Sequence, residues 1–253
     1  MDNVCIFTIC HRETFFLPRW INYYRNFIHA KNIFILLHND DTPIDSDINT
    51  LKLKTDTVFD HRWLRDVVEN FQRFLLCTYK CVIFAEIDEF IYSTDYQFAD
   101  NIQRFLIDDT ISHQTVYGYD IVQGDEEPYL SDNIYDTIIS KRKYRVRRKD
   151  FDKTLISKRP IRYTCGFHAT LDKTIPDFRY NFTMAHLHKV DKQLIINRHL
   201  DRLHLNVCDD KLGEHNKNPD PDYILNYLYY GNNNNKQSQE IIPDIDREAL
   251  SLL

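Results

Sequence analysis

The chain has 253 residues, of which 43% are hydrophobic and 28% charged, with a formal net charge of −6. This composition is typical of a globular protein that buries a sizeable core, and it excludes a disordered chain. The negative charge argues against a protein that binds nucleic acid with its whole surface. With five glycines, the sequence contains neither Gly-x-Gly-x-x-Gly nor Gly-x4-Gly-Lys-Ser/Thr, the glycine-rich motifs that hold phosphates.

The sequence also predicts where the protein resides. No apolar run approaches the roughly 18 residues that a membrane helix needs, and the first residues lack the form of a signal peptide. We therefore predict no membrane span and a cytoplasmic protein, in the host cytoplasm if the source is viral. The six cysteines are then expected to be reduced thiols.

The predicted elements alternate between strands and helices from the beginning of the chain. Residues 4–9 form a short β-branched apolar run, which favours a buried strand; a helix over 13–30 and a second buried strand over 32–37 follow. Such a unit predicts two parallel strands with a right-handed connection. A weaker strand is expected at 57–59, followed by a helix over 65–80 and a buried strand over 81–85.

The second half of the sequence is more mixed. Alternating apolar and polar residues predict a strand over 114–122, and a helix is expected over 191–205. A polar tract at 231–237 reads as a linker, followed by a peripheral helix or loose tail. We therefore predict one α/β domain over 1–230, with a Rossmann-like, mixed and mostly parallel sheet flanked by helices, and an Asn-rich linker and tail over 231–253.

Two carboxylates follow the buried strand at 81–85. Glu86 and Asp88 stand where this apolar run ends, and ligands of parallel α/β sheets bind at the carboxyl ends of the strands. Burying unpaired carboxylates is costly, so a divalent cation or a basic partner is expected beside them. Carboxylate oxygens suit Mn²⁺ or Mg²⁺. An exposed acidic loop without a function is the alternative interpretation.

Several segments resemble one family of enzymes. They are TICHRE at 8–13, LPRWINYY at 17–24, HNDD at 38–41, VIFAEIDEFI at 82–91, SKRP at 157–160 and AHLHK at 185–189. Together they are similar to nucleotide-sugar glycosyltransferases related to the large family two, whose metal motif has the form Asp-x-Asp-Glu-Phe. The chain departs from that pattern at Glu86, where Asp is usual, and at 11–13. Its composition, poor in glycine and rich in Ile, Asn, Asp and Tyr, suggests an AT-rich coding source. Its compact form resembles glycosyltransferases encoded by large DNA viruses and small bacterial ones.

The resemblance implies a GT-A fold and transfer of a sugar from a nucleoside diphosphate sugar, expected to be a UDP-sugar, to a glycan or glycoprotein. It implies Mn²⁺ or Mg²⁺ as cofactor, with candidate ligands Asp88, Glu86, His186 and His188. The implied contacts of the nucleotide sugar are His11, Glu13, Asp40, Arg65, Glu86 and Lys158.

An inverting transfer would also need a base to accept the proton of the acceptor hydroxyl. Acidic residues follow the strand after the metal motif, where a base is expected, and the candidates are Asp120, Asp125 and Glu126.

The alternative function rests on a basic stretch. Residues 141–149 hold seven Lys or Arg in nine positions, a pattern that could bind nucleic acid or another polyanion. A charged surface hairpin explains the same pattern. We expect nucleic acid to be an unlikely partner, because few aromatic residues interleave with the basic ones along the sequence.

Overall fold

The computed structural model describes residues 1–253 except 56–59, 96, 135, 173–175, 204–217 and 231–238. Its centre is a sheet with strand order β10-β7-β6-β8-β4-β1-β2-β3, and β9 lies between β5 and β6. The strands are β1 (Val4–Cys10), β2 (Ile33–His38), β3 (Asn49–Leu53), β4 (Cys81–Phe84), β5 (Glu89–Ser93), β6 (His113–Val122), β7 (Tyr144–Arg147), β8 (Lys153–Ser157), β9 (Phe182–His186) and β10 (Gln239–Ile241).

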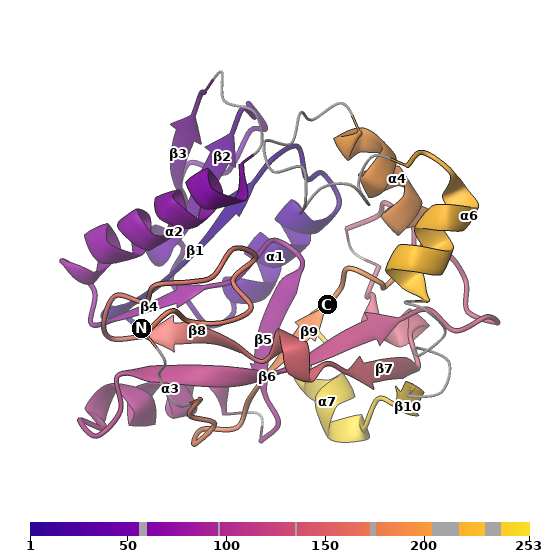
Figure 1. The fold of residues 1–253 in the computed structure, drawn as a ribbon. Coiled ribbons are helices and arrows are strands. Elements are labelled where there is room, and N and C mark those ends of the chain that lie inside the picture. Colours follow the sequence, from indigo (N-terminus) through magenta and orange to yellow (C-terminus); the bar gives the residue numbers. More distant parts are fainter. Residues whose placement is uncertain (56–59, 96, 135, 173–175, 204–217, 231–238) are drawn as a thin grey trace.

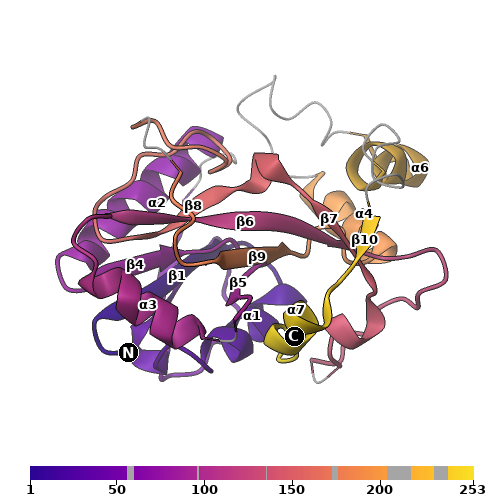
Figure 2. The same ribbon diagram turned by 90° about the horizontal axis from the view of Figure 1, so that it is seen from below.

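Helices cover both faces of the sheet (Figures 1 and 2). The longer ones are α1 (Phe16–Tyr24), α2 (His61–Leu76), α3 (Phe98–Ile107) and α4 (Lys192–Arg202), and the shorter ones are α6 (Pro221–Ile224) and α7 (Asp244–Ala249). Figure 2 shows α2 on one face and α1, α3 and α7 on the other. The predicted α/β class, with a mixed sheet flanked by helices, is confirmed. None of the helices in the described ranges is both long and apolar enough to cross a membrane.

The sheet has a parallel part and a largely antiparallel part. Strands β3, β2, β1 and β4 are parallel neighbours, as the strand–helix–strand pattern predicts. Beyond β4, the pairs β4–β8, β6–β8 and β6–β7 are antiparallel, whereas β6 and β9 are parallel. Because β1, β2 and β4 point the same way, the loops that follow them meet at one edge of the sheet, which we call the carboxyl edge.

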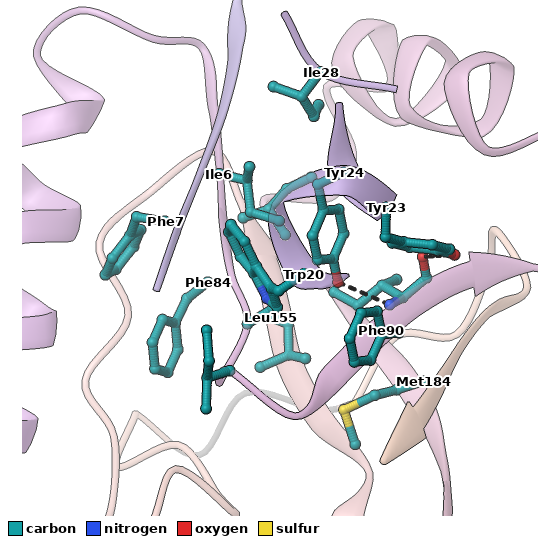
Figure 3. Close-up of a cluster of buried hydrophobic side chains, with 14 of the residues drawn as sticks. Ile6, Phe7, Trp20, Tyr23, Tyr24, Ile28, Phe84, Phe90, Leu155 and Met184 are labelled. Atoms are coloured by element: carbon teal, nitrogen blue, oxygen red, sulfur yellow. Dashed lines mark hydrogen bonds between the residues drawn. The ribbon is translucent and has the colours of Figure 1, made fainter. Parts of the chain in front are cut away.

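A large part of the core lies between the sheet and α1. Trp20, Tyr23 and Tyr24 on α1 are fully buried against residues of β1, β4 and β5 (Figure 3). The two tyrosine hydroxyls donate hydrogen bonds to the carbonyls of Ile91 and Glu89, so these polar atoms are satisfied inside the core. The pairing fixes β5, and therefore the turn between β4 and β5, against the rest of the domain.

One predicted helix is shorter in the structure, and one predicted strand is not tested by it. The helix predicted over 13–30 is confined to Phe16–Tyr24, because the Asn26 amide donates to the carbonyls of Asn22 and Tyr23 and the chain continues in turns. The strand predicted at 57–59 lies outside the described residues. The structure also has β3 at Asn49–Leu53, a short exposed edge strand that was not predicted from the sequence.

The end of the chain packs against the domain. Residues 231–238 of the predicted linker lie outside the described residues, but β10 pairs with β7, and Ile242, Leu250 and Leu253 are buried in the core. Asp246 on α7 forms a buried ion pair with Arg145. Residues 239–253, predicted to be a loose tail or a peripheral helix, therefore supply part of the hydrophobic core.

Candidate functional site

The loop after β1 forms the first wall of the candidate site. Arg12 adopts a positive φ of 53°, an uncommon conformation for a side chain of this size. Asp40, at the end of β2, accepts a hydrogen bond from the Arg12 backbone N–H at 2.7 Å and holds the loop in this conformation. Burial alone would raise the pKa of Asp40, but hydrogen bonds from Thr42 and Arg12 lower it, so this carboxylate is ionised.

A cavity of about 370 Å³ opens between this loop and α4. Its lining includes His11, Arg12, Glu13 and Arg198. His11 Nδ1 lies 2.7 Å from the carbonyl oxygen of His38, whereas its Nε2 is buried with no hydrogen-bond partner in the described structure. An imidazole nitrogen of this kind is available to a polar group of a ligand.

Asp88 lies close to this cavity, and an arginine on α4 fixes its side chain. Its carboxylate accepts a hydrogen bond from the Arg198 guanidinium at 2.9 Å, and Arg198 also donates to Glu13 at 2.9 Å. Burial alone would raise the pKa of Asp88, but the charge of Arg198 and the neighbouring histidines lower it well below its usual value. Asp88 is therefore an anion at neutral pH. Arg198 was not predicted from the sequence, because 110 residues separate it from Asp88.

Main-chain pairing brings His188 to Asp88. The Leu187 N–H donates to the Asp88 carbonyl at 2.8 Å, which places the next residue, His188, beside the acidic side chain. Its Nδ1 is 3.9 Å from Asp88 Oδ2. Burial lowers the pKa of His188 to about 4, so its imidazole is neutral at neutral pH and keeps a lone pair for a ligand.

Glu86 pairs with a different basic residue than Asp88 does. It forms an ion pair with Lys153 on β8, and the same ammonium group contacts Glu89 at 2.6 Å. Lys153 is 1% exposed, so both contacts are with a buried charge. Burial alone would lower the pKa of Lys153, but the two carboxylates raise it. The basic partner that the sequence predicted as one alternative is therefore present for both Glu86 and Asp88.

A third charged cluster lies between β6 and β9. The parallel register sets Asp120 opposite His186, and the Asp120 carboxylate lies 2.7 Å from His186 Nδ1 and 2.8 Å from the Arg148 guanidinium. Burial alone would raise the pKa of Asp120, but the hydrogen bond with His186 and the charges of His186, Lys189 and Arg148 lower it to about 2. Burial would lower the pKa of His186, but its contact with Asp120 raises it.

Gly118 allows this cluster to form. A Cβ at this position would lie 2.4 Å from the carbonyl oxygen of Phe151, so only glycine lets the turn after β7 approach β6 so closely. The Phe151 ring then packs against His186, with 4.7 Å between ring centroids. His186 in turn stacks on His188 at 5.8 Å, which connects the Asp120 cluster to Asp88.

The structure brings together only some of the predicted site residues. His11, Glu13, Asp40, Asp88 and His188 meet at the carboxyl edge, Glu86 faces Lys153, and Asp120 holds His186. Arg65 lies on α2 and pairs with the adjacent Asp66. Lys158 lies at the opposite end of β8 and donates to the carbonyls of Phe105 and Asp108. Asp125 and Glu126 are exposed in the loop after β6, and Asp125 pairs with Lys192.

The basic stretch 141–149 forms ion pairs within the domain. Five of its basic residues contact carboxylates, and the pairs are Lys141–Asp136, Arg142–Asp191, Arg145 with Glu240 and Asp246, Arg147–Asp152, and Arg148 with Asp120 and Asp150. Most of the charge that favoured a polyanion site in the sequence is therefore neutralised inside the fold. Such partners come from distant segments and cannot be recognised from the stretch itself.

A divalent cation has two suitable donors at the carboxyl edge. In the described part of the chain, no group of three or more His, Cys, Asp or Glu side chains forms a complete metal site. Asp88 and His188 nevertheless lie together, one anionic and one neutral. Mg²⁺ commonly takes one or two protein ligands and completes its coordination with substrate phosphates and water. The pair fits a cation of that kind, whereas Glu86 and His186 are engaged elsewhere.

Comparison with known proteins supplies no family for this chain. No protein-family model matches the sequence, and a search of curated proteins finds no relative.

Proposed function

We propose that this protein is a glycosyltransferase of the GT-A type, which transfers a sugar from a nucleoside diphosphate sugar to a hydroxyl of a glycan or glycoprotein. The observation that carries the proposal is the cavity beside the loop after β1, whose lining residue Arg198 pairs with Asp88 at the carboxyl edge of the parallel strands. Ligands of open α/β sheets bind at this edge. The resemblance of residues 82–91 to the glycosyltransferase metal motif supports the same interpretation.

The proposed donor is a UDP-sugar, bound with its diphosphate near Asp88 and His188. These two residues would hold Mn²⁺ or Mg²⁺, which neutralises the negative charge that grows on the leaving diphosphate. His11 offers its buried Nε2 to the nucleotide, and Asp40 acts indirectly by fixing the loop that carries Arg12. No glycine-rich loop is required, in keeping with the glycine-poor sequence.

The reaction forms one bond and breaks one. The acceptor oxygen bonds to the anomeric carbon as the bond from that carbon to the diphosphate oxygen breaks, and the hydroxyl proton passes to a base. Asp120 is a weak base itself, because the three groups around it stabilise its ionised form. We assign proton acceptance to His186 in its neutral form, with Asp120 orienting the imidazole, since this is how carboxylate–imidazole pairs act in other enzymes. Because Asp120 raises the pKa of His186, the neutral form is reached at higher pH than for an ordinary histidine.

Titration calorimetry of UDP in the presence of Mn²⁺ tests the donor site. We expect micromolar to millimolar binding to the unchanged protein and at least tenfold weaker binding to Asp88→Asn, which removes the anionic ligand. Asp2→Asn is the matched control, because Asp2 is exposed and precedes β1 at the opposite edge of the sheet. Absence of binding of both UDP and GDP to the unchanged protein would refute the proposed function.

Kinetics test the proton acceptor separately. His186→Gln and Asp120→Asn should each lower the transfer rate about 100-fold or more, because a positioned base contributes roughly this factor. UDP affinity should change less than threefold in His186→Gln, since the imidazole acts on the acceptor. An unchanged rate in both variants would place the base elsewhere.

A further inference from the structure

Arg198 shares its guanidinium between two carboxylates that belong to different loops. Its Nε donates to Glu13 in the loop after β1, and a terminal nitrogen donates to Asp88 in the turn after β4, both at 2.9 Å. The side chains of Arg198, Glu13 and Asp88 are 8%, 10% and 11% exposed, so bulk water screens their charges weakly. Arg198 is itself fixed, because α4 begins at Asp191, whose carboxylate caps the helix and contacts buried Arg142.

The net charge of Arg198, Glu13 and Asp88 determines how strongly the site attracts a cation. Two carboxylates and one guanidinium sum to one negative charge. A metal ion at Asp88 would therefore meet the repulsion of Arg198 at close range. Removing the guanidinium would leave two negative charges, and removing the Glu13 carboxylate would leave none. Because the site is buried, either change in charge would strongly alter the electrostatic energy of a cation at Asp88.

We propose that Arg198 sets the affinity of Asp88 and His188 for a divalent cation, keeping it low until the phosphates of a nucleotide add their own negative oxygens. This inference rests on the proposed function, which places the cation at Asp88. Arg198 is a positioning residue in this scheme: it restrains the Asp88 carboxylate and lowers its attraction for the free metal. The consequence is ordered binding, in which the cation enters efficiently only with the nucleotide.

Binding of Mn²⁺ alone, followed by the electron paramagnetic resonance signal of the free ion, tests this inference. Arg198→Met should bind Mn²⁺ at least tenfold more tightly than the unchanged protein, and Glu13→Gln should bind it several-fold more weakly. Arg198→Lys keeps the positive charge and should stay within threefold. Arg73→Met, an exposed change in the last turn of α2, is the matched control and should have no effect.

The two directions of change separate an electrostatic role from a structural one. Tighter binding by an Arg198→Met variant whose circular dichroism spectrum matches that of the unchanged protein reports the lost positive charge, because damage to the site itself would weaken binding. If that variant does not fold, Glu13→Gln and Arg198→Lys still decide the question. Unchanged Mn²⁺ affinity in Glu13→Gln, or loss of affinity in a folded Arg198→Met, would overturn the inference.

Titration of UDP distinguishes failure of this inference from failure of the proposed function. Equal UDP binding with Mn²⁺ and with EDTA would overturn the role of Arg198 toward a metal and leave the glycosyltransferase proposal standing. No UDP or GDP binding in either condition would overturn both.

Discussion

Glu86 and Asp88 are neighbours in the sequence, yet each is neutralised by a different buried cation. Lys153 from β8 neutralises Glu86, and Arg198 from α4 contacts Asp88. Breaking such a buried pair costs more than the pair itself contributes, because the remaining charge loses its partner without regaining water. The two acids of the motif therefore have separate roles: Asp88 pairs with Arg198, which lines the cavity, and Glu86 joins β4 to β8.

The ion pairs of Asp120 should make the fold sensitive to acid. The pKa of this carboxyl is about 2 in the folded protein, against 3.8 for an ordinary aspartate. Because the folded-state pKa is lowered, the contribution of Asp120 is complete above pH 4, amounts to about 2 kcal/mol, and falls by about half at pH 3. Urea unfolding at pH 6 and pH 3 should show a loss in the unchanged protein that exceeds the loss in Asp120→Asn by about 1 kcal/mol.

Comparison of the two proteins at both pH values removes the contribution of other carboxyl groups. Equal losses in the unchanged protein and in Asp120→Asn would show that Asp120 has the same affinity for protons in the folded and unfolded chains.

Sequence reasoning reached the residues that mark the site but missed their partners. Asp88, Asp40 and the two histidines were found because they follow apolar runs or match a motif, and both signals are local. Arg198 and Lys153 have no such signal. Their partners lie 110 and 67 residues away along the chain, and only the completed sheet brings them together.

At the scale of whole elements, α4 is the helix that carries Arg198 to the site. Its N-cap, Asp191, accepts hydrogen bonds from the backbone N–H groups of Leu194 and Leu130 and contacts the guanidinium of fully buried Arg142 at 3.2 Å. One carboxylate therefore begins the helix, fixes the loop after β6 and balances a buried charge. The position of α4 depends strongly on this single residue.

Asp191→Ala should lower the free energy of unfolding by about 3–5 kcal/mol, the cost of leaving Arg142 without its buried partner. Asp60→Ala is the comparison, because Asp60 is the N-cap of α2 and accepts a hydrogen bond from Arg62 in a more exposed setting. Loss of an ordinary cap costs about 1 kcal/mol. Urea unfolding measures both, and similar values for the two variants would contradict the assigned role of Asp191.

The sequence predicted the secondary structure best where an element is a continuous apolar strand or a helix with clear periodicity. The structure has the buried strands at 33–38 and 81–84 and the helix α4 close to their predicted places. Continuous apolar runs and helical periodicity are signals of secondary structure that can be read from the local sequence. The antiparallel part of the sheet was harder to foresee. Its strands β5, β7 and β8 are four or five residues long, and their pairing is decided by contacts between distant segments.

At the scale of the molecule, the last residues complete the fold. Strand β10 extends the sheet edge beside β7, and Ile242, Leu250 and Leu253 enter the core. Burial of each such side chain contributes about 1.5–3 kcal/mol, so the three together approach the total stability of an ordinary domain.

A chain ending at Tyr230 should therefore be insoluble or unfolded at room temperature. Circular dichroism and thermal unfolding of residues 1–230 measure this directly. A milder variant, Leu250→Ala, should lower the free energy of unfolding by about 2–5 kcal/mol. If residues 1–230 unfold at the same temperature as the full chain, the segment 239–253 adds no stability and is a separate tail.

The register of β6 against β9 limits how the chain can change in length. Side chains alternate between the two faces of a strand, and His186 meets Asp120 because both point to the same face. A single inserted residue between 183 and 186 would turn the imidazole to the opposite face, whereas an insertion in the exposed segment 125–134 would leave the pairing intact. Descendants of this sequence should therefore keep the spacing within β6 and β9 unchanged.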